Sequence, residues 1–242
     1  MNSNEKRAPM ERCLFIHGFT GGEYEISPLA QFLEQHQYPA RTFTLKGHGG
    51  SRHDLLQSDR QGWRQSAEDQ LQEMLNDGDR VHLIGFSTGA LIASHLSVQY
   101  REQIKSLTLL STPVFPLNLL EILKTLGSPV MIRNYLSKFG STPAKATREF
   151  QRLVRESFEI YPQIETPTLI VQGGRDHLVR AKSAAYLHRT IPSASKRVLM
   201  VERSGHMLCH CEDSSLIMDE VLQFIQSSGR ASINKLQGYS AK

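Results

Sequence analysis

The sequence predicts an α/β fold with a mainly parallel central sheet and helices on both of its faces. Short apolar runs that read as buried strands alternate along the chain with segments that read as helices, and this order builds parallel sheets. The run 106–111 (SLTLLS) is apolar on both faces, which is typical of a central parallel strand. At 242 residues, the chain is long enough for one domain with a full core.

The first part of the chain contains two expected strands, residues 12–17 and 40–45. Between them, Ser27-Pro28 is typical of a helix start, with the serine as N-cap and the proline in the first turn. The helix that follows carries Leu29, Phe32 and Leu33 on one face. Another helix is expected at 63–75, because apolar residues recur there every four positions: Trp63, Ala67, Leu71 and Leu75.

The second half repeats the buried-strand pattern at 168–172 and 197–201 and ends in a helix at about 214–225. Residues 113–167 break this rhythm, because they contain six prolines and no convincing buried strand. About 50 residues rarely hold an independent core, so we predict a small helical cap insertion there. The α/β core is then formed by residues 1–112 and 168–228, and the polar residues 229–242 are expected to be a flexible tail.

Composition excludes several classes of protein. The net charge is only +4 with no block of Lys and Arg, so no nucleic-acid-binding face is expected. No segment approaches the ~20 apolar residues of a membrane span, and the polar N-terminus lacks the apolar core of a signal peptide. An odd count of three cysteines is not a disulfide framework. We therefore expect a cytoplasmic protein; no residues indicate its oligomeric state.

The motif Gly85-Phe86-Ser87-Thr88-Gly89 follows the apolar run 81–84 and precedes the small-residue stretch 90–96. This is G-x-S-x-G between a strand and a helix, the setting in which a sharp turn exposes a serine hydroxyl. The glycines are needed because a side chain on either would collide where strand and helix nearly touch. We therefore predict that Ser87 is a nucleophile.

A serine nucleophile needs a base, and the base needs a carboxylate to hold its tautomer. Asp176 follows the expected strand 168–172, and His206 follows the strand 197–201. Loops at the carboxyl ends of parallel strands build the sites of open α/β sheets. We expect Ser87, Asp176 and His206 to meet at this edge, with backbone N–H groups of Thr88 and Phe19 as the oxyanion hole.

These residues resemble the α/β-hydrolase superfamily, most closely the bacterial carboxylesterases and monoacylglycerol lipases with a short helical cap. The similarity is carried by four motifs: residues 16–21 (IHGFTG), 46–49 (KGHG), 85–89 (GFSTG) and 204–206 (SGH). It implies Ser87 as nucleophile, Asp176 as acid and His206 as base. It also implies that 113–167 covers an acyl pocket and that no cofactor is required. Thr88 and Ala90 differ from the Met or Leu and the further glycine usual in the family.

His48 and the apolar residues of the cap are each open to two interpretations. His48, between glycines, contacts substrate or is a structural loop histidine. Apolar cap residues either line the acyl pocket or hold the cap to the body; they are Leu117, Leu120, Leu123, Met131, Ile132, Tyr135 and Phe139. Among them, Leu120, Leu123 and Tyr135 are the predicted substrate contacts.

The leading hypothesis is a serine hydrolase that acts on small-molecule carboxylic esters with an apolar acyl group. Dehalogenases and epoxide hydrolases of this fold would need Asp at position 87 and are disfavoured. Thioesterase, C–C hydrolase, peptidase and haloperoxidase-like activities share the triad and stay open, as does a non-catalytic binder. A metal hydrolase is a further alternative, because four potential ligands lie within six residues: His206, Cys209, His210 and Cys211.

Overall fold

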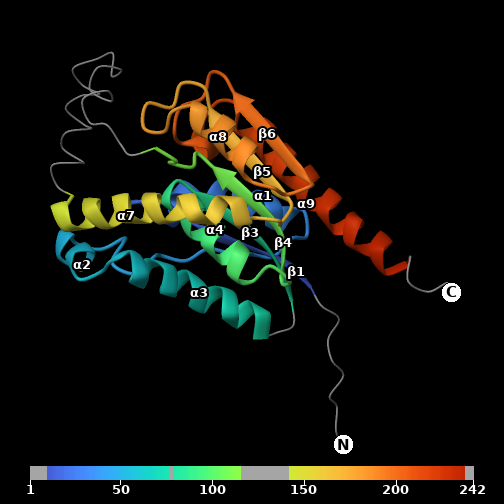
Figure 1. Cartoon of the computed structure of the whole chain (residues 1–242), viewed down its shortest axis with the longest axis horizontal. Coiled ribbons are helices and arrows are strands. Elements are labelled where there is room, and N and C mark those ends of the chain that lie inside the picture. Colours follow the sequence, from blue (N-terminus) through green and yellow to red (C-terminus); the bar gives the residue numbers. More distant parts are fainter. Residues whose placement is uncertain (1–9, 77–78, 116–141, 238–242) are drawn as a thin grey trace, which may run out of the picture.

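The computed structural model describes residues 10–76, 79–115 and 142–237. They form a six-stranded sheet in the order β2-β1-β3-β4-β5-β6 (Figure 1), in which every neighbouring pair is parallel. This confirms the predicted α/β class. The strands are β1 (Glu11–Ile16), β2 (Ala40–Arg41), β3 (Arg80–Phe86), β4 (Ile104–Leu110), β5 (Thr168–Gly173) and β6 (Lys196–Val201).

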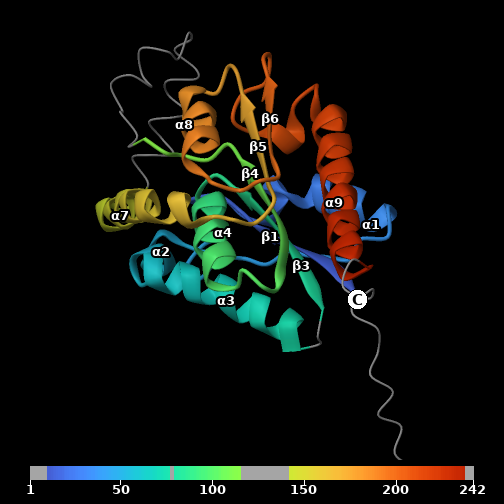
Figure 2. The same ribbon diagram turned by 45° about the vertical axis from the view of Figure 1, so that its right-hand side comes forward.

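Helices cover both faces of the sheet (Figures 1 and 2). One face packs against α3 (Arg60–Asn76), α4 (Thr88–Gln99) and α8 (Lys182–Thr190), with α7 (Ala144–Ile160) lying over α3 and α4, and the other face packs against α1 (Ser27–Gln35) and α9 (Ser214–Gln237). Because a parallel sheet is buried on both sides, the apolar side chains divide into two cores. The larger core contains Trp63, Leu91 and Phe150, and the smaller one contains Leu29, Val221 and Phe224.

Helix α4, which follows the G-x-S-x-G motif, is buried from Thr88 through Ser97. It lies between the sheet and α7, which crosses it on the outside (Figure 2). A helix that is apolar on every side needs such a position. The segment after the predicted nucleophile is therefore held firmly on both sides.

The expected second strand, 40–45, is much shorter than predicted. Only Ala40 and Arg41 pair with β1. Beyond them, the Thr42 and Thr44 hydroxyls bond to the Glu23 carboxylate, and the Leu45 N–H donates to a histidine ring instead of a neighbouring strand. Side-chain partners thus replace the backbone ladder.

Two helix boundaries differ from the predictions, and one helix was not predicted. Ser27 is the first helical residue rather than the N-cap, and its hydroxyl donates to the Glu23 carbonyl at 2.7 Å. A short helix, α2 (Arg52–Leu56), was not predicted, although Ser51 and Asp54 form a capping box at its start. Helix α9 continues past the expected end at Ile225 to Gln237, so helix occupies most of the predicted tail.

Of the predicted cap, 113–167, the structure describes residues 113–115 and 142–167. This described part contains α7 and a 3₁₀ turn, Tyr161–Gln163, and no strand. The predicted substrate contacts Leu120, Leu123 and Tyr135 lie outside the described residues, as do Leu117, Met131, Ile132 and Phe139.

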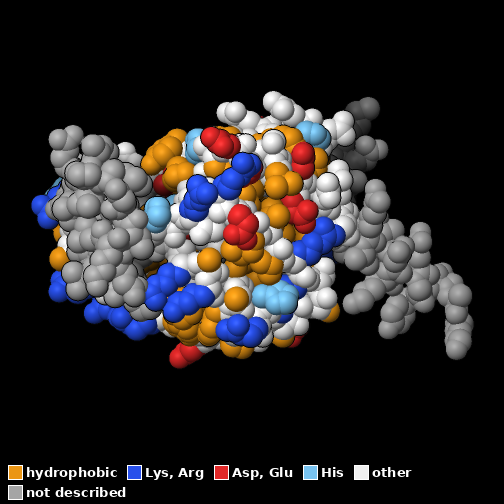
Figure 3. Space-filling view, turned by 90° about the horizontal axis from the view of Figure 1, so that it is seen from above, with side chains coloured by type: hydrophobic (Ala, Val, Ile, Leu, Met, Phe, Trp, Pro, Cys, Tyr) orange, Lys and Arg blue, Asp and Glu red, His pale blue; other side chains and the backbone are white. Residues whose placement is uncertain are grey.

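The surface seen in Figure 3 carries Lys and Arg side chains close to Asp and Glu side chains, with apolar ones between them. This mixture agrees with the small net charge of +4. No helix in the described ranges is long and apolar enough to cross a membrane.

Candidate active site

Ser87 lies at the sharp turn between β3 and α4. Its backbone has φ 53° and ψ −116°, a conformation that L-residues rarely adopt and that costs energy unless the surroundings enforce it. The Ser87 N–H donates to the Leu110 carbonyl at 2.8 Å, which ties the turn to β4. The strain at Ser87 is therefore held by the neighbouring strand.

The two glycines of the motif are required by close backbone approach, as predicted. A Cβ on Gly89 would lie 1.9 Å from the Ile16 carbonyl oxygen, and one on Gly85 would lie 2.4 Å from the Gly89 carbonyl oxygen. Both distances are far below a van der Waals contact. Any side chain at either position would push α4 away from the sheet.

The loops that carry Asp176 and His206 touch one another beyond β5 and β6. The Arg175 N–H donates to the Ser204 carbonyl at 2.9 Å. A Cβ on Gly173 would lie only 2.3 Å from the Gly205 carbonyl oxygen. The absence of a side chain at Gly173 thus lets the two predicted residues meet.

His206 and Asp176 form a hydrogen-bonded pair. The His206 Nδ1–H donates to Asp176 Oδ2 at 2.8 Å, and the Asp176 side chain is fully buried. Its other oxygen, Oδ1, accepts from the Leu178 and Val179 N–H groups, both at 2.9 Å. Because a carboxylate can only accept, Nδ1 carries the imidazole proton and leaves Nε2 as the basic nitrogen.

The surroundings of Asp176 keep it ionised. Burial alone would raise its pKa, but the charge and hydrogen bond of His206, together with the Val179 and Leu178 N–H groups, hold the pKa below its ordinary value. A carboxylate that stays charged can hold the imidazole tautomer and stabilise an imidazolium.

Ser87 and His206 line the same cavity. They are not hydrogen-bonded to each other in the described structure. Apolar side chains form most of the remaining wall: Phe19, Phe86, Pro113, Phe150, Leu178, Val179 and Met207. Gly18, Thr20, Glu25 and Thr142 complete the lining. Such a site suits an apolar group held beside a few polar atoms.

The loop that carries Phe19 is fixed by two buried side chains. The His17 Nδ1–H donates to the Gly18 carbonyl at 2.9 Å, while Nε2 accepts from the Leu45 N–H at 3.0 Å. This arrangement needs a neutral ring, and burial lowers the pKa of His17 accordingly. The Gly18 N–H donates to Glu25 Oε2 at 2.8 Å.

The N–H groups of Phe19 and Thr88 were predicted to form the oxyanion hole. Neither donates to an acceptor within the described residues. Thr88 is the first residue of α4, where N–H groups have no intrahelical acceptor. Both donors are therefore available, and their role stays a prediction.

Glu25 and Phe150 line the cavity and were missed by the sequence reasoning. Glu25 is only 5% exposed, and its carboxylate occupies the space that a side chain on Gly21 would need. Its signal was weak: a carboxylate close in sequence to a glycine-rich loop. Phe150 comes from the buried face of α7, and nothing in its local sequence indicates that it reaches the cavity.

The ring of His48 contacts the rings of His17, Phe19 and Trp63, with 5.3–6.0 Å between centroids. It lines a neighbouring hollow that shares Thr20 and Thr142 with the Ser87 cavity. Burial, with the nearby His17, lowers the pKa of His48 to about 4. Its contact with substrate stays a prediction.

The four potential metal ligands between residues 206 and 211 have different partners. His206 bonds to Asp176, and His210 Nε2–H donates to the Tyr24 carbonyl at 2.8 Å. Cys209 is buried, which raises its pKa to about 12, and Cys211 Sγ donates to the Leu208 carbonyl. Within the described ranges no three His, Cys, Asp or Glu side chains are arranged to hold a metal ion.

Comparisons with known proteins show the family of this chain. A sequence model of the Alpha/beta hydrolase family matches residues 13–215. A carboxylesterase of Bacillus subtilis (strain 168) is 23% identical over 226 residues, covering 88% of this chain and 91% of the relative. A thermostable monoacylglycerol lipase of Bacillus sp. (strain H-257) is 23% identical over 229 residues, with coverage of 87% and 88%.

Solved structures share the fold. The metagenome-derived lipolytic enzymes LipS and LipT are represented by a chain with a TM-score of 0.79 at 19% identity, covering 90% of this chain and 94% of that one. A soluble variant of monoglyceride lipase from Saccharomyces cerevisiae has a TM-score of 0.74 at 17% identity, covering 93% and 89%. With a family match over most of its length, this chain belongs to the alpha/beta hydrolase family.

Proposed function

We propose that this protein is a serine hydrolase that cleaves carboxylic esters through an acyl-enzyme on Ser87. One observation carries the proposal: the buried Asp176 holds His206 by a 2.8 Å hydrogen bond, and His206 lines the same cavity as Ser87. A binding protein would not need an imidazole whose tautomer is held by a buried carboxylate at the side of a strained serine.

In the proposed reaction, Ser87 Oγ attacks the ester carbonyl carbon while His206 Nε2 takes the hydroxyl proton. The carbonyl oxygen becomes an oxyanion that accepts hydrogen bonds from the Phe19 and Thr88 N–H groups. The alcohol then leaves with the proton from the imidazolium, and Asp176 stabilises the positive charge until that transfer. Water attacks the acyl-enzyme by the same route and restores the free Ser87 hydroxyl.

The lining of the cavity supports an apolar acyl group as part of the substrate. Its apolar side chains come from several segments of the chain, and burial of apolar surface contributes about 25 cal/mol per Å² to binding. The names of the relatives, a carboxylesterase and a monoacylglycerol lipase, support esters over other acyl compounds.

A fluorophosphonate probe tests the nucleophile directly. The wild-type protein should be labelled at Ser87, and Ser87→Ala should lose both the label and p-nitrophenyl ester turnover by several orders of magnitude. Ser97→Ala is the matched control, because Ser97 is a buried serine of the same helix, α4. A folded wild-type protein that is not labelled, or an active Ser87→Ala variant, would refute the proposal.

The substrate class is tested by a series of esters. Turnover should rise along p-nitrophenyl esters of increasing acyl length until the cavity is filled. A monoacylglycerol and an acyl thioester of the same chain length complete the series. Preference for the thioester by tenfold or more in kcat/KM would replace the ester assignment with a thioesterase while retaining Ser87.

A further inference from the structure

Phe19 lies between two aromatic rings from distant parts of the chain. Its ring stacks on Phe150 of α7, with 5.2 Å between centroids and 19° between planes, and contacts Trp63 of α3 at 5.6 Å. Trp63 is fully buried and donates from Nε1 to Ser58 Oγ at 3.0 Å. The ring of the predicted oxyanion-loop residue therefore contacts rings from both α3 and α7.

The Phe19 N–H has no acceptor in the described structure, whereas the Gly18 carbonyl of the same peptide accepts from His17 Nδ1 at 2.9 Å and from the Gly21 N–H at 3.3 Å. The next residue, Thr20, has φ 57°, so the backbone here does not follow a regular ladder. The Phe19 peptide is therefore held at its carbonyl oxygen by His17 and Gly21, and the Phe150 and Trp63 rings hold the side chain that follows its N–H.

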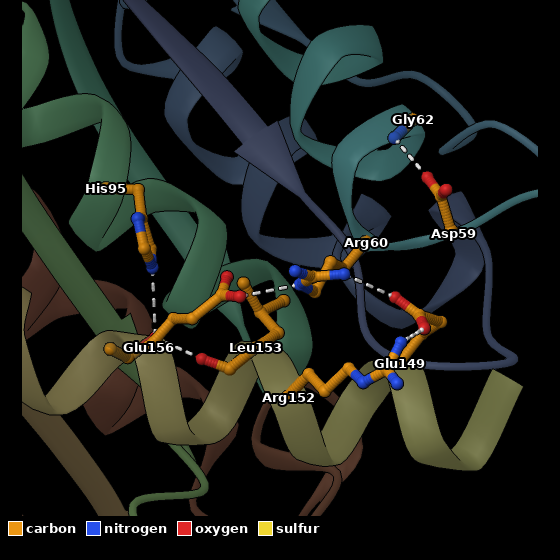
Figure 4. Close-up of polar contacts among 9 residues, drawn as sticks. Asp59, Arg60, Gly62, His95, Glu149, Arg152, Leu153 and Glu156 are labelled. Atoms are coloured by element: carbon orange, nitrogen blue, oxygen red, sulfur yellow. Dashed lines mark hydrogen bonds and ion pairs between the residues drawn. The ribbon is translucent and has the colours of Figure 1, made fainter.

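Next to this stack, a forked ion pair joins the same two helices (Figure 4). Arg60, at the start of α3, contacts Glu149 through Nη1 and Glu156 through Nε, each at 2.7 Å. Arg60 lies three residues before Trp63, and Glu149 lies next to Phe150 in the sequence. The fork and the aromatic stack are thus neighbouring contacts between α3 and α7.

Glu149 makes this fork more than an exposed ion pair. Its side chain is only 7% exposed, and burial alone would raise its pKa. The hydrogen bond and charge of Arg60, with a contribution from Arg152, outweigh burial and hold the pKa below its ordinary value. Without Arg60, the buried carboxylate would keep only the Arg152 contact, which disfavours the present docking of α7.

We propose that Arg60 and Phe150 are positioning residues that couple the docking of α7 to the oxyanion hole. The Arg60 fork holds α7 against α3, α7 presses Phe150 on Phe19, and the Phe19 N–H is thereby aimed at the developing oxyanion. This inference rests on the proposed function of Ser87. Neither Arg60 nor its carboxylate partners lines the Ser87 cavity, so Arg60 acts through the stack.

Substitution of Arg60 tests the coupling without altering the cavity wall. In Arg60→Met, kcat should fall about tenfold with KM within about twofold, because a misaimed oxyanion donor weakens transition-state binding more than substrate binding. Arg60→Lys should be intermediate, since an ammonium group cannot reproduce the fork. Arg41→Met is the matched control, because it breaks an exposed ion pair between Arg41 and Glu73. Glu73 belongs to α3, the helix that also carries Arg60.

Two further measurements separate positioning from general stability. A boronic acid that forms a tetrahedral adduct at Ser87 should bind about tenfold more weakly to Arg60→Met. Trp63 is the only tryptophan of the sequence, so its fluorescence reports the stack directly. Its emission should change in Arg60→Met and in Phe150→Leu, and stay unchanged in Arg41→Met.

The outcomes are distinct. Wild-type kcat, boronate affinity and Trp63 emission in Arg60→Met, with only a lower Tm, would show that the fork merely stabilises the fold and would overturn the coupling. If the wild-type protein is not labelled by a fluorophosphonate, the proposed function itself fails and the coupling fails with it. If it is labelled and Arg60→Met behaves like Arg41→Met, only the coupling fails.

Discussion

Replacement of His95 by glutamine should remove one contribution to the loss of unfolding free energy of this protein in acid. His95, labelled in Figure 4, lies on α4 and is 6% exposed. Its Nε2 is hydrogen-bonded to Ser157 Oγ of α7 at 3.2 Å. Burial, helped by the charge of Arg64, lowers the pKa of His95 to about 4. A glutamine can keep a hydrogen bond to Ser157 but cannot take up a proton.

The magnitude follows from the difference between the folded and unfolded protein. The unfolded chain protonates His95 with an ordinary pKa of 6.5, and the folded one only near 4. The stability from neutral His95 is therefore fully present above pH 6.5 and is lost as the pH falls towards 4. At about 1.36 kcal/mol per pKa unit, the total loss is about 3 kcal/mol, of which about 2 kcal/mol occurs by pH 5.

Urea unfolding at several pH values between 8 and 4.5 measures this effect. The difference in unfolding free energy between the wild-type protein and His95→Gln should shift by about 2 kcal/mol against the wild type from pH 8 to pH 5. Ser157→Ala is the control, because it removes the hydrogen-bond partner and leaves the titrating ring, so its pH dependence should follow the wild type. A constant difference between wild type and His95→Gln across this range would refute the reasoning.

Three further predictions concern the site and the sheet. Asp176→Asn should lower kcat for a p-nitrophenyl ester by about 10³- to 10⁴-fold, because the imidazole of His206 loses its tautomer control; a loss below tenfold would contradict that role. Gly89→Ala should lower the unfolding free energy by about 2–4 kcal/mol, whereas Gly205→Ala, whose Cβ would have no neighbour closer than 3.9 Å, should be nearly neutral in urea unfolding. A hydrogen bond with the buried imidazole of His82 lowers the pKa of Glu11 to about 2. In acid unfolding, the unfolding free energy of the wild type should therefore exceed that of Glu11→Gln above pH 4.5, and this difference should disappear from pH 4.5 to 2.

Strand positions were predicted well where the pattern is purely local. Strands β4, β5 and β6 lie within one or two residues of the runs 106–111, 168–172 and 197–201. For β4 and β5 the reason is that a parallel strand buried on both faces is apolar over its length, whereas the edge strand β6, expected to be buried, is partly exposed. The second strand was wrong beyond Arg41. There, contacts with a carboxylate and an imidazole from other segments take the place of strand pairing, and no local pattern reveals such partners.

The candidate site could be predicted in part for a topological reason. Parallel strands end at one edge, so residues that follow β3, β5 and β6 come together whatever their distance in sequence. Asp176 and His206 are accordingly hydrogen-bonded. The residues that complete the cavity wall, Glu25 and Phe150, follow no strand directly, and strand-end reasoning could not find them.

The sequence alone determined the order of strands and helices, the turn at Ser87 and the residues expected around it, because these depend on local periodicity, glycine sterics and the direction of parallel strands. The tertiary structure decided what those residues contact. Periodicity shows which face of α7 is buried, but only the packed molecule shows that this face sets Phe150 against Phe19 and Glu149 against Arg60. Such contacts join segments far apart in the chain, and their partners are chosen by shape and charge in three dimensions.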